Sequence, residues 1–342
     1  MSVTILSTSF DRPHEPAGHD DLSMFHLISA EKSGEATAPC EIIDPLPLPL
    51  LEGEICNLQQ EGCLLDSQGS FDVYLAHADS IPHLLKEIGR LREVSFRMVG
   101  EGTGKAFDLD DYDSKYMHLF LWHRDDRAIA GGYRLGRTDV LLKNGGHAEL
   151  YTASLFDFDP EFWDEISPAL EMGRSFVSPQ YQRSIHPLSL LWRGIGKFVS
   201  QNPKYSKLFG PVSISDLYSK PSQELMVGYL TQHHAEEQLA PMVQPRNPFQ
   251  LDISSGQGES PATMEQLAAM VAELEHDRKG VPILIRQYIK LHARMLSCNV
   301  DSNFNNALDL LVLVDLTKSP IEALSRHMGK QAAAEFMAFH NG

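Results

Sequence analysis

The sequence is short of cysteines, basic residues and long apolar runs, and each shortage excludes a class of protein. Its four cysteines, at positions 40, 56, 63 and 298, form no C-x-x-C pair, so we expect neither a disulfide framework nor a metal site. The 29 Lys and Arg against 46 Asp and Glu give a net charge of −17, which argues against a nucleic-acid-binding protein. Apolar runs such as LLVLV at 310–314 are far below the roughly 20 residues that span a bilayer.

Targeting, nucleotide-binding and serine-nucleophile signals are also missing. The first residues contain no basic stretch followed by an apolar core, so no signal peptide is expected and a cytoplasmic location is favoured. Peripheral contact with the inner face of a membrane stays open. The segment GEGTGK at 100–105 lacks the spacing G-x-x-x-x-G-K-[ST], so we expect a mobile loop beside a substrate cleft there. No G-x-S-x-G elbow occurs.

The order of the predicted elements indicates a mixed α/β protein of the α+β type. Residues 1–69 have little periodicity and carry prolines at 45, 47 and 49, so we expect an N-terminal arm, partly extended or disordered. Strand and helix patterns then alternate over 70–316, with a polar insertion at about 247–262. Residues 317–342 are predicted to form a helical C-terminal extension.

One long window of the chain contains no carboxylate. Residues 172–215, 44 in all, carry six Lys and Arg but no Asp or Glu. The window covers a predicted strand, the turn PQYQRSIHP and the start of a helix, and a helix N-terminus surrounded by bases favours anions. We therefore predict an anion site with Arg183, Arg193 and Lys197. A basic surface face without a ligand is the alternative.

The segment DLDDYD at 108–113 has the opposite character, with Asp108, Asp110, Asp111 and Asp113 close together. It lacks the glycine and the distal glutamate of a calcium-binding loop. Three interpretations stay open: a solvated acidic turn, a site for a cationic amine, or a set of carboxylates that orients arginines such as Arg92 and Arg134.

Several segments in a fixed order resemble one family. They are LREVSFR (91–97), DLDDYD (108–113), GGYRLGRTD (131–139), ALEMGRSFVSPQYQ (169–182), LLWRGIG (190–196) and FGPVSIS (209–215). Together they are similar to the GNAT-superfamily acyltransferases of the ornithine- or glycine-lipid, hemolysin-like type, and more distantly to acyl-homoserine-lactone synthases. The resemblance covers roughly residues 70–315. It implies a GNAT fold, in which helices flank a central mixed β-sheet that splays near its middle.

The resemblance also implies an activity. A long-chain fatty acyl group would pass from acyl carrier protein to the amine of an amino acid such as ornithine or glycine. Acyl-carrier protein or acyl-CoA would be the co-substrate, with no bound cofactor. The loop QRSIHP at 182–187 lacks the glycines of the superfamily's Q/R-x-x-G-x-G/A loop, which favours a carrier-protein donor, and the basic window would suit an acidic carrier.

The family's motifs assign roles to residues of this chain. Glu171 is expected to be the general base that deprotonates the amine; the alternative is a structural glutamate paired with Arg134 or Arg174. The expected site residues are catalytic Glu171, Arg134 and Arg174; acceptor-binding Arg92, Asp108, Asp110 and Asp113; carbonyl-polarising Phe176, Val177 and Ser178; and carrier-binding Arg183, Arg193 and Lys197. Two alternatives to the activity remain: a lactone synthase that uses S-adenosylmethionine, and a lipid- or carrier-binding module without catalysis.

Overall fold

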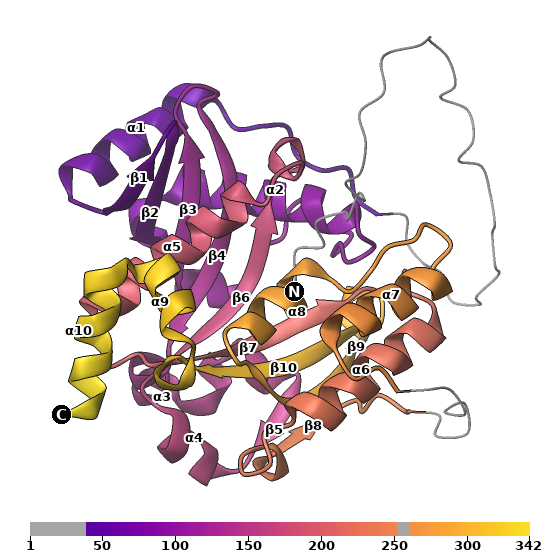
Figure 1. The fold of residues 1–342 in the computed structure, drawn as a ribbon. Helices are drawn as coiled ribbons and strands as arrows, with labels where there is room; N and C mark the ends of the chain where they lie inside the picture. Colours follow the sequence, from indigo (N-terminus) through magenta and orange to yellow (C-terminus); the bar gives the residue numbers. More distant parts are fainter. Residues whose placement is uncertain (1–38, 252–259) are drawn as a thin grey trace, which may run out of the picture.

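A mixed eight-stranded sheet forms the centre of the protein. The computed structural model describes residues 39–251 and 260–342, and Figure 1 shows the sheet running through its middle. The strand order is β1-β2-β3-β4-β6-β7-β10-β9. The strands are β1 (Leu64–Gln68), β2 (Phe71–His77), β3 (Met117–His123), β4 (Ala128–Arg137), β6 (Ala169–Val177), β7 (Lys207–Ile214), β9 (Arg294–Asp301) and β10 (Ala307–Asp315).

The sheet splays at its only parallel pair. β6 and β7 are paired at three positions, from Ala169 opposite Lys207 to Glu171 opposite Phe209, and no pairing continues beyond them. All other neighbours in this sheet are antiparallel. A side chain at Gly210 would bring its Cβ to 2.1 Å from the carbonyl oxygen of Met172, so the strands can approach here only with glycine. The predicted mixed, splayed sheet is confirmed.

Helices cover both faces of the sheet. In Figure 1, α5 (His186–Gln201) lies in front of β3 and β4, and α2 (Pro82–Arg97) lies behind the sheet. Each helix buries an apolar stripe at helical spacing, such as Leu84, Ile88 and Leu91 of α2. The remaining helices are α3 (Thr138–Gly145), α4 (Pro160–Ile166), α6 (Lys220–His234), α7 (Met264–Leu274), α8 (Ile283–Lys290), α9 (Ile321–Met328) and α10 (Lys330–Asn341).

Two features complete the fold. The strands β5 (Phe156–Phe158) and β8 (Val243–Pro245) form a separate two-stranded sheet, which Figure 1 places below the main one. Helices α9 and α10 lie within the predicted C-terminal extension. Within 39–251 and 260–342, no helix has the length and apolar character required to cross a bilayer.

Residues 39–69 contain a helix and an edge strand as well as extended chain. They contain α1 (Leu48–Gln60) and β1, and β1 pairs with β2 as the edge strand of the main sheet. Pro49 lies in the first turn of α1, where the missing N–H of proline removes no helical hydrogen bond. The sheet therefore begins at Leu64 rather than near residue 70. The expectations for residues 1–38, and for 252–259 of the polar insertion, lie outside the described residues.

Candidate active site

The site begins with a bulge in β6 beside the splayed gap. Arg174 has a φ of 50°, a left-handed conformation that is uncommon for a residue with a side chain. The register with β4 shifts at the same place, since Gly132 faces Phe176 but Arg134 faces Gly173. Bulges of this kind re-aim side chains and concentrate near functional sites. Here the bulge turns Arg174 toward Asp108 and toward Asp110, which also pairs with Arg134.

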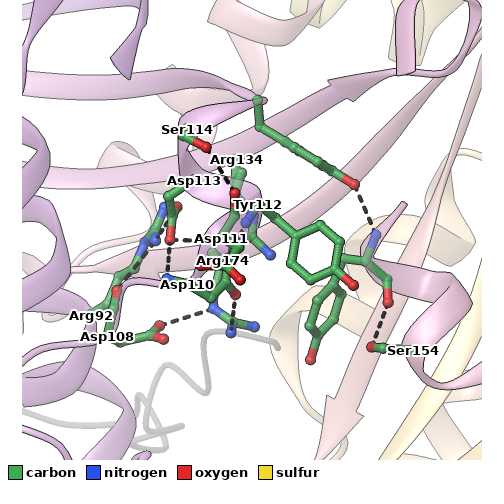
Figure 2. Close-up of polar contacts among 12 residues, drawn as sticks. Arg92, Asp108, Asp110, Asp111, Tyr112, Asp113, Ser114, Arg134, Ser154 and Arg174 are labelled. Atoms are coloured by element: carbon green, nitrogen blue, oxygen red, sulfur yellow. Dashed lines mark hydrogen bonds and ion pairs between the residues drawn. The ribbon is translucent and has the colours of Figure 1, made fainter. Parts of the chain in front are cut away.

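Six charged residues from four segments form one buried ion-pair network. Three are arginines and three are aspartates, so their formal charges balance. They are Arg92, Asp108, Asp110, Asp113, Arg134 and Arg174, and Figure 2 shows them converging. All of the acceptor-binding residues predicted from the sequence thus meet the predicted catalytic arginines.

Arg174 joins two of the aspartates. Its Nε lies 3.0 Å from Oδ2 of Asp108, and its Nη2 lies 2.9 Å from Oδ2 of Asp110. Oδ1 of Asp110 also accepts a hydrogen bond from Nη1 of Arg134 at 2.5 Å. Its side chain is 24% exposed, against 1% for Arg134 and 3% for Arg174. Asp110 is therefore the member of the network that solvent or a ligand can reach most easily.

The other end of the network is closed to solvent. Asp113 accepts from Nη1 of Arg92 at 2.7 Å and lies 3.3 Å from Arg134. Burial would raise the pKa of Asp113, but the two guanidinium groups hold this pKa well below its ordinary value. Burial raises the pKa of Asp108, against the opposing effect of Arg174 and Arg92. The carboxylates of one loop thus have their pKa values shifted in opposite directions.

Local hydrogen bonds fix the shape of the aspartate loop. Asp110 caps the short 3₁₀ helix Asp111–Ser114 by accepting from the N–H of Tyr112, and Asp113 accepts from the N–H of Asp110 at 2.8 Å. This reciprocal capping box places both carboxylates beside the arginines. Since Asp108 and Asp113 are each 2% exposed, the solvated-turn interpretation is wrong, and the interpretation as carboxylates that orient arginines is confirmed.

Aromatic rings enclose Arg134 and Arg174. The guanidinium carbon of Arg134 lies 5.1 to 5.7 Å from the ring centres of Tyr112, Tyr116 and Tyr151. Arg174 lies 4.9 Å from the rings of Tyr151 and Phe304. Ring faces stabilise cations without neutralising them. Arg134 Nη2 and Arg174 Nη1 are buried and have no hydrogen-bond acceptor among the described residues, so each arginine keeps a donor for a ligand.

Glu171 pairs with neither arginine. Its Oε1 accepts from the N–H of Thr152 at 2.6 Å, and its Oε2 accepts from the hydroxyl of Tyr116. The side chain is 1% exposed, and burial raises its pKa while the Tyr116 hydrogen bond lowers it. Tyr116 in turn accepts from the N–H of Tyr151 at 2.9 Å. Glu171 therefore holds the aromatic rings that lie beside Arg134.

The expected carbonyl-polarising residues differ in which edge of β6 they face. The N–H of Ser178 donates to the carbonyl oxygen of Ala130 in β4 at 2.9 Å. It is therefore not free to polarise the thioester carbonyl, and that prediction is wrong for Ser178. Successive N–H groups of a strand point to opposite edges, so that of Val177 points into the splayed gap. The Val177 carbonyl already accepts there from Gln182 at 2.7 Å. Phe176 faces Gly132 across the β4–β6 ladder.

The acid-free window is not an unpaired basic face, because carboxylates from elsewhere in the chain neutralise half of it. Arg174 pairs with Asp108 and Asp110, Arg193 lies 2.9 Å from Asp66, and Lys204 lies 2.6 Å from Asp139. Three of the six bases in 172–215 are therefore paired with carboxylates, and the anion site stays a prediction. Arg183, in the turn before α5, and Lys197, on α5, are exposed and remain the bases of this surface.

Several residues near the site carried no sequence signal of their role. Tyr116 and Tyr151 belong to no recognisable motif, and their part in the site depends on packing. Glu101 lies in GEGTGK, which the sequence predicted to be a mobile loop beside the cleft, yet its side chain is fully buried. Its Oε2 accepts from Ser213 of β7 at 2.9 Å. The segment thus lines the splayed strands, but with a carboxylate rather than with its glycines.

Comparisons with known proteins agree with this architecture. Residues 91–193 match the acetyltransferase (GNAT) domain family. Two curated proteins named glycine N(alpha)-acyltransferase, from Phocaeicola vulgatus and Bacteroides thetaiotaomicron, are each 27% identical over 305 residues. The matches cover 84% of this chain and 92% and 89% of those proteins.

Solved structures give a weaker likeness. The acyl-homoserine lactone synthases MesI and BjaI, both described as CoA-dependent, are 12% and 11% identical, with TM-scores of 0.34 and 0.37. The matches cover 75% and 77% of this chain and 95% and 97% of those chains. Scores this low carry no argument. The family match, the curated relatives and the mixed sheet agree on one conclusion: residues 91–193 lie in a GNAT acetyltransferase-type domain, and the chain is similar to N-acyltransferases.

Proposed function

We propose that this protein transfers a long-chain fatty acyl group from a carrier thioester to the amine of a small amino acid. Glycine is the first acceptor to test, because both curated relatives are named for it. The observation that carries the proposal is the pair of buried donors without acceptors, Arg134 Nη2 and Arg174 Nη1. Guanidinium groups bind carboxylates well, and an amino-acid acceptor brings a carboxylate to be bound.

The splayed gap supplies the second half of the reaction. A thioester that entered between β6 and β7 would bring its carbonyl to the N–H of Val177, which stabilises the oxyanion formed when the amine attacks. Arg92 has a positioning role, because its ion pair with Asp113 holds that carboxylate beside Arg134. In place of the direct base role, we assign Glu171 a positioning role, since both of its oxygens are already hydrogen-bonded.

Acyl carrier protein is the proposed donor and acyl-CoA is its alternative. The turn 182–187 has no glycine, which would hinder close backbone contact with a pyrophosphate. Arg183 and Lys197 are the exposed bases for a carrier, whereas Arg193 is paired with Asp66. Peripheral membrane contact and a cytoplasmic location belong to the same proposal, since the product is a lipid and the donor is a cytoplasmic thioester.

Lipid mass spectrometry tests the proposal. Extracts from cells that express the wild type should contain new N-acyl amino acids, whose masses identify the acceptor and the chain length. Cells that express Arg174→Lys at the same level should lack them. Absence of new lipids from both, with the wild-type protein present and its donor supplied, would contradict the proposal.

A further inference from the structure

A second group of carboxylates lies across the gap from the ion-pair network. Ser213 of β7 faces Asp309 of β10, and Asp309 faces Asn299 of β9. Side chains directly opposite in antiparallel strands have their Cβ atoms about 5 Å apart. Glu101 is hydrogen-bonded to Ser213, so its carboxylate lies beside that of Asp309. Asp301, at the end of β9, is also buried.

The hydrogen bonds of Glu101 use only one of its two carboxylate oxygens. Glu101 follows the end of α2, and its backbone N–H donates to the carbonyl of Phe96 in that helix at 2.8 Å. Its Oε2 accepts from Ser213, but its Oε1 is buried without a hydrogen-bond partner in the described part of the chain. Oδ2 of Asp301 is in the same state. Leaving a buried acceptor unpaired costs free energy, so both oxygens favour a ligand that donates.

Glu101, Asp301 and Asp309 form a trio of buried carboxyls. Across 39–251 and 260–342, no ion pair joins any of the three to a lysine or arginine. The nearest arginine is Arg174, which acts on Asp309 but is bonded to Asp108 and Asp110. The network balances its charge, whereas the trio carries an excess of acid. A zwitterionic amino acid would suit this arrangement. Its ammonium would face the trio of carboxyls, and its carboxylate would face the free guanidinium donor of Arg174.

We propose that Glu101, Asp301 and Asp309 receive the ammonium group of the acceptor, and that Glu101 is the general base that takes its proton. The carboxylate at the other end of the acceptor then accepts hydrogen bonds from Arg174 Nη1 and Arg134 Nη2. This inference rests on the proposed acyl transfer and assigns the acceptor's orientation within that site.

The chemistry balances with the groups present. Glu101 accepts one proton from the ammonium, which frees the nitrogen lone pair. The N–C bond forms at the thioester carbonyl, the tetrahedral intermediate loses its second amine proton, and the C–S bond breaks. The departing thiolate takes up a proton, so the products are an amide and a thiol.

The surroundings of Glu101 suit a base that works near neutral pH. Burial raises the pKa of Glu101 to about 8, and the negative charge of Asp309 adds to the increase. Burial raises the pKa of Asp309 as well, with Asp301 adding to it and Arg174 opposing it. These carboxyls act on neighbouring groups in turn: Glu101 contributes to the raised pKa of Tyr218, and Asp309 to the raised pKa of Tyr151 and of Cys298.

The test compares Glu101→Gln, Asp309→Asn and a matched control, Glu275→Gln. Glu275 is also buried, but it pairs with Lys279 and accepts from the N–H of Ser219. With palmitoyl-acyl carrier protein and glycine at pH 8, Glu101→Gln should lower kcat by about a hundredfold or more. Asp309→Asn should raise the KM for glycine about tenfold, and the control should change neither. Wild-type kcat should rise with pH through about 8, and Glu101→Gln should lose this rise.

Calorimetric titration of glycine into the same proteins, without donor, separates failure of the inference from failure of the function. If the wild type makes product and Glu101→Gln keeps both its kcat and its pH dependence, the inference is wrong while the function stands. If the wild type makes no product, the function fails, and glycine binding that weakens tenfold in Asp309→Asn would still support the ammonium site. Equal glycine binding by the wild type and Asp309→Asn, or no glycine binding by either, would overturn the ammonium site. Thermal unfolding confirms that each variant is folded.

Discussion

Arg174 and Asp110 lie 2.9 Å apart, and their ion pair ties the bulge in β6 to a loop that precedes it by 64 residues. Asp110 also holds Arg134, so one partly exposed carboxylate orients both catalytic arginines. The site is therefore assembled by charge pairing between the loop and the strands. Asp110, 24% exposed, is the most exposed group beside the two guanidinium groups.

Replacing Arg174 with lysine tests this assembly. Lysine cannot form the forked contact with two aspartates, so Asp108 would be left buried with an incomplete partner. We expect an activity loss of about a hundredfold and a stability loss of about 2–4 kcal/mol. Chemical denaturation and acceptor kinetics measure the two effects. Arg246→Lys is the control: Arg246 pairs with Asp157 on the surface, and we expect it to change stability by under about 0.5 kcal/mol. An Arg174→Lys enzyme with wild-type kinetics would contradict the role of Arg174.

Gly210 tests the splay of the sheet. A methyl group at this position would lie 2.1 Å from the carbonyl oxygen of Met172, so Gly210→Ala must force β6 and β7 apart. We expect a stability loss of about 1–3 kcal/mol, together with altered acyl-donor kinetics. Gly53→Ala, in α1 with no atom within 4 Å of the new Cβ, should instead gain about 0.5–1 kcal/mol. Equal effects of the two substitutions on the free energy of unfolding would be inconsistent with the close approach of the strands.

The sequence predicted the order of the elements and the identity of the ion-pair network better than it predicted the network's surroundings. Asp108, Asp110, Asp113, Arg134 and Arg174 are identified through the resemblance of their segments to the family's motifs, in which each side chain has a matching position. The partners of Glu171 do not, since Tyr116 and Thr152 reach it only through tertiary packing.

The ion pairs of residues 172–215 with distant carboxylates could not be predicted from the sequence, for the same physical reason. Local charge along the chain ignores carboxylates that fold onto it, and Asp66 lies 127 residues from Arg193 in sequence. The strand at 64–68 was missed because its short polar sequence, LLDSQ, has no clear alternation. Edge strands exposed to solvent are the ones in which hydrophobic patterning is weakest.

The raised pKa of Glu101 predicts how stability depends on pH. Burial raises this pKa from 4.5 in the unfolded chain to about 8 in the folded protein. The folded state therefore binds the extra proton between these values, so this stabilising contribution is complete below about pH 4.5 and is lost as pH rises toward 8. The free energy of unfolding should fall by up to about 1.4 kcal/mol per pH unit in this range. Glu101→Gln should remove this slope, and an unchanged slope in urea titrations would contradict the buried, partly protonated state.

Glu171→Gln distinguishes the positioning role from the base role. The substitution keeps an oxygen that accepts from the N–H of Thr152, and its amide N–H can donate to the Tyr116 hydroxyl in place of the bond that this hydroxyl donates to Glu171. We expect kcat to fall by about tenfold or less, with the same pH dependence as the wild type. A loss of about a hundredfold or more, with an altered pH profile, would restore Glu171 as the base and count against Glu101. Rates measured from pH 6 to pH 9.5 provide the comparison.

The transfer itself is tested most directly with purified protein, palmitoyl-acyl carrier protein or palmitoyl-CoA, and nitrogen-labelled glycine, followed by mass spectrometry. Our account predicts N-palmitoylglycine that carries the label and one free thiol for each amide formed. Hydrolysis of the thioester without labelled amide, or no reaction with glycine, ornithine and the other amino acids, would contradict an amino-acid N-acyltransferase.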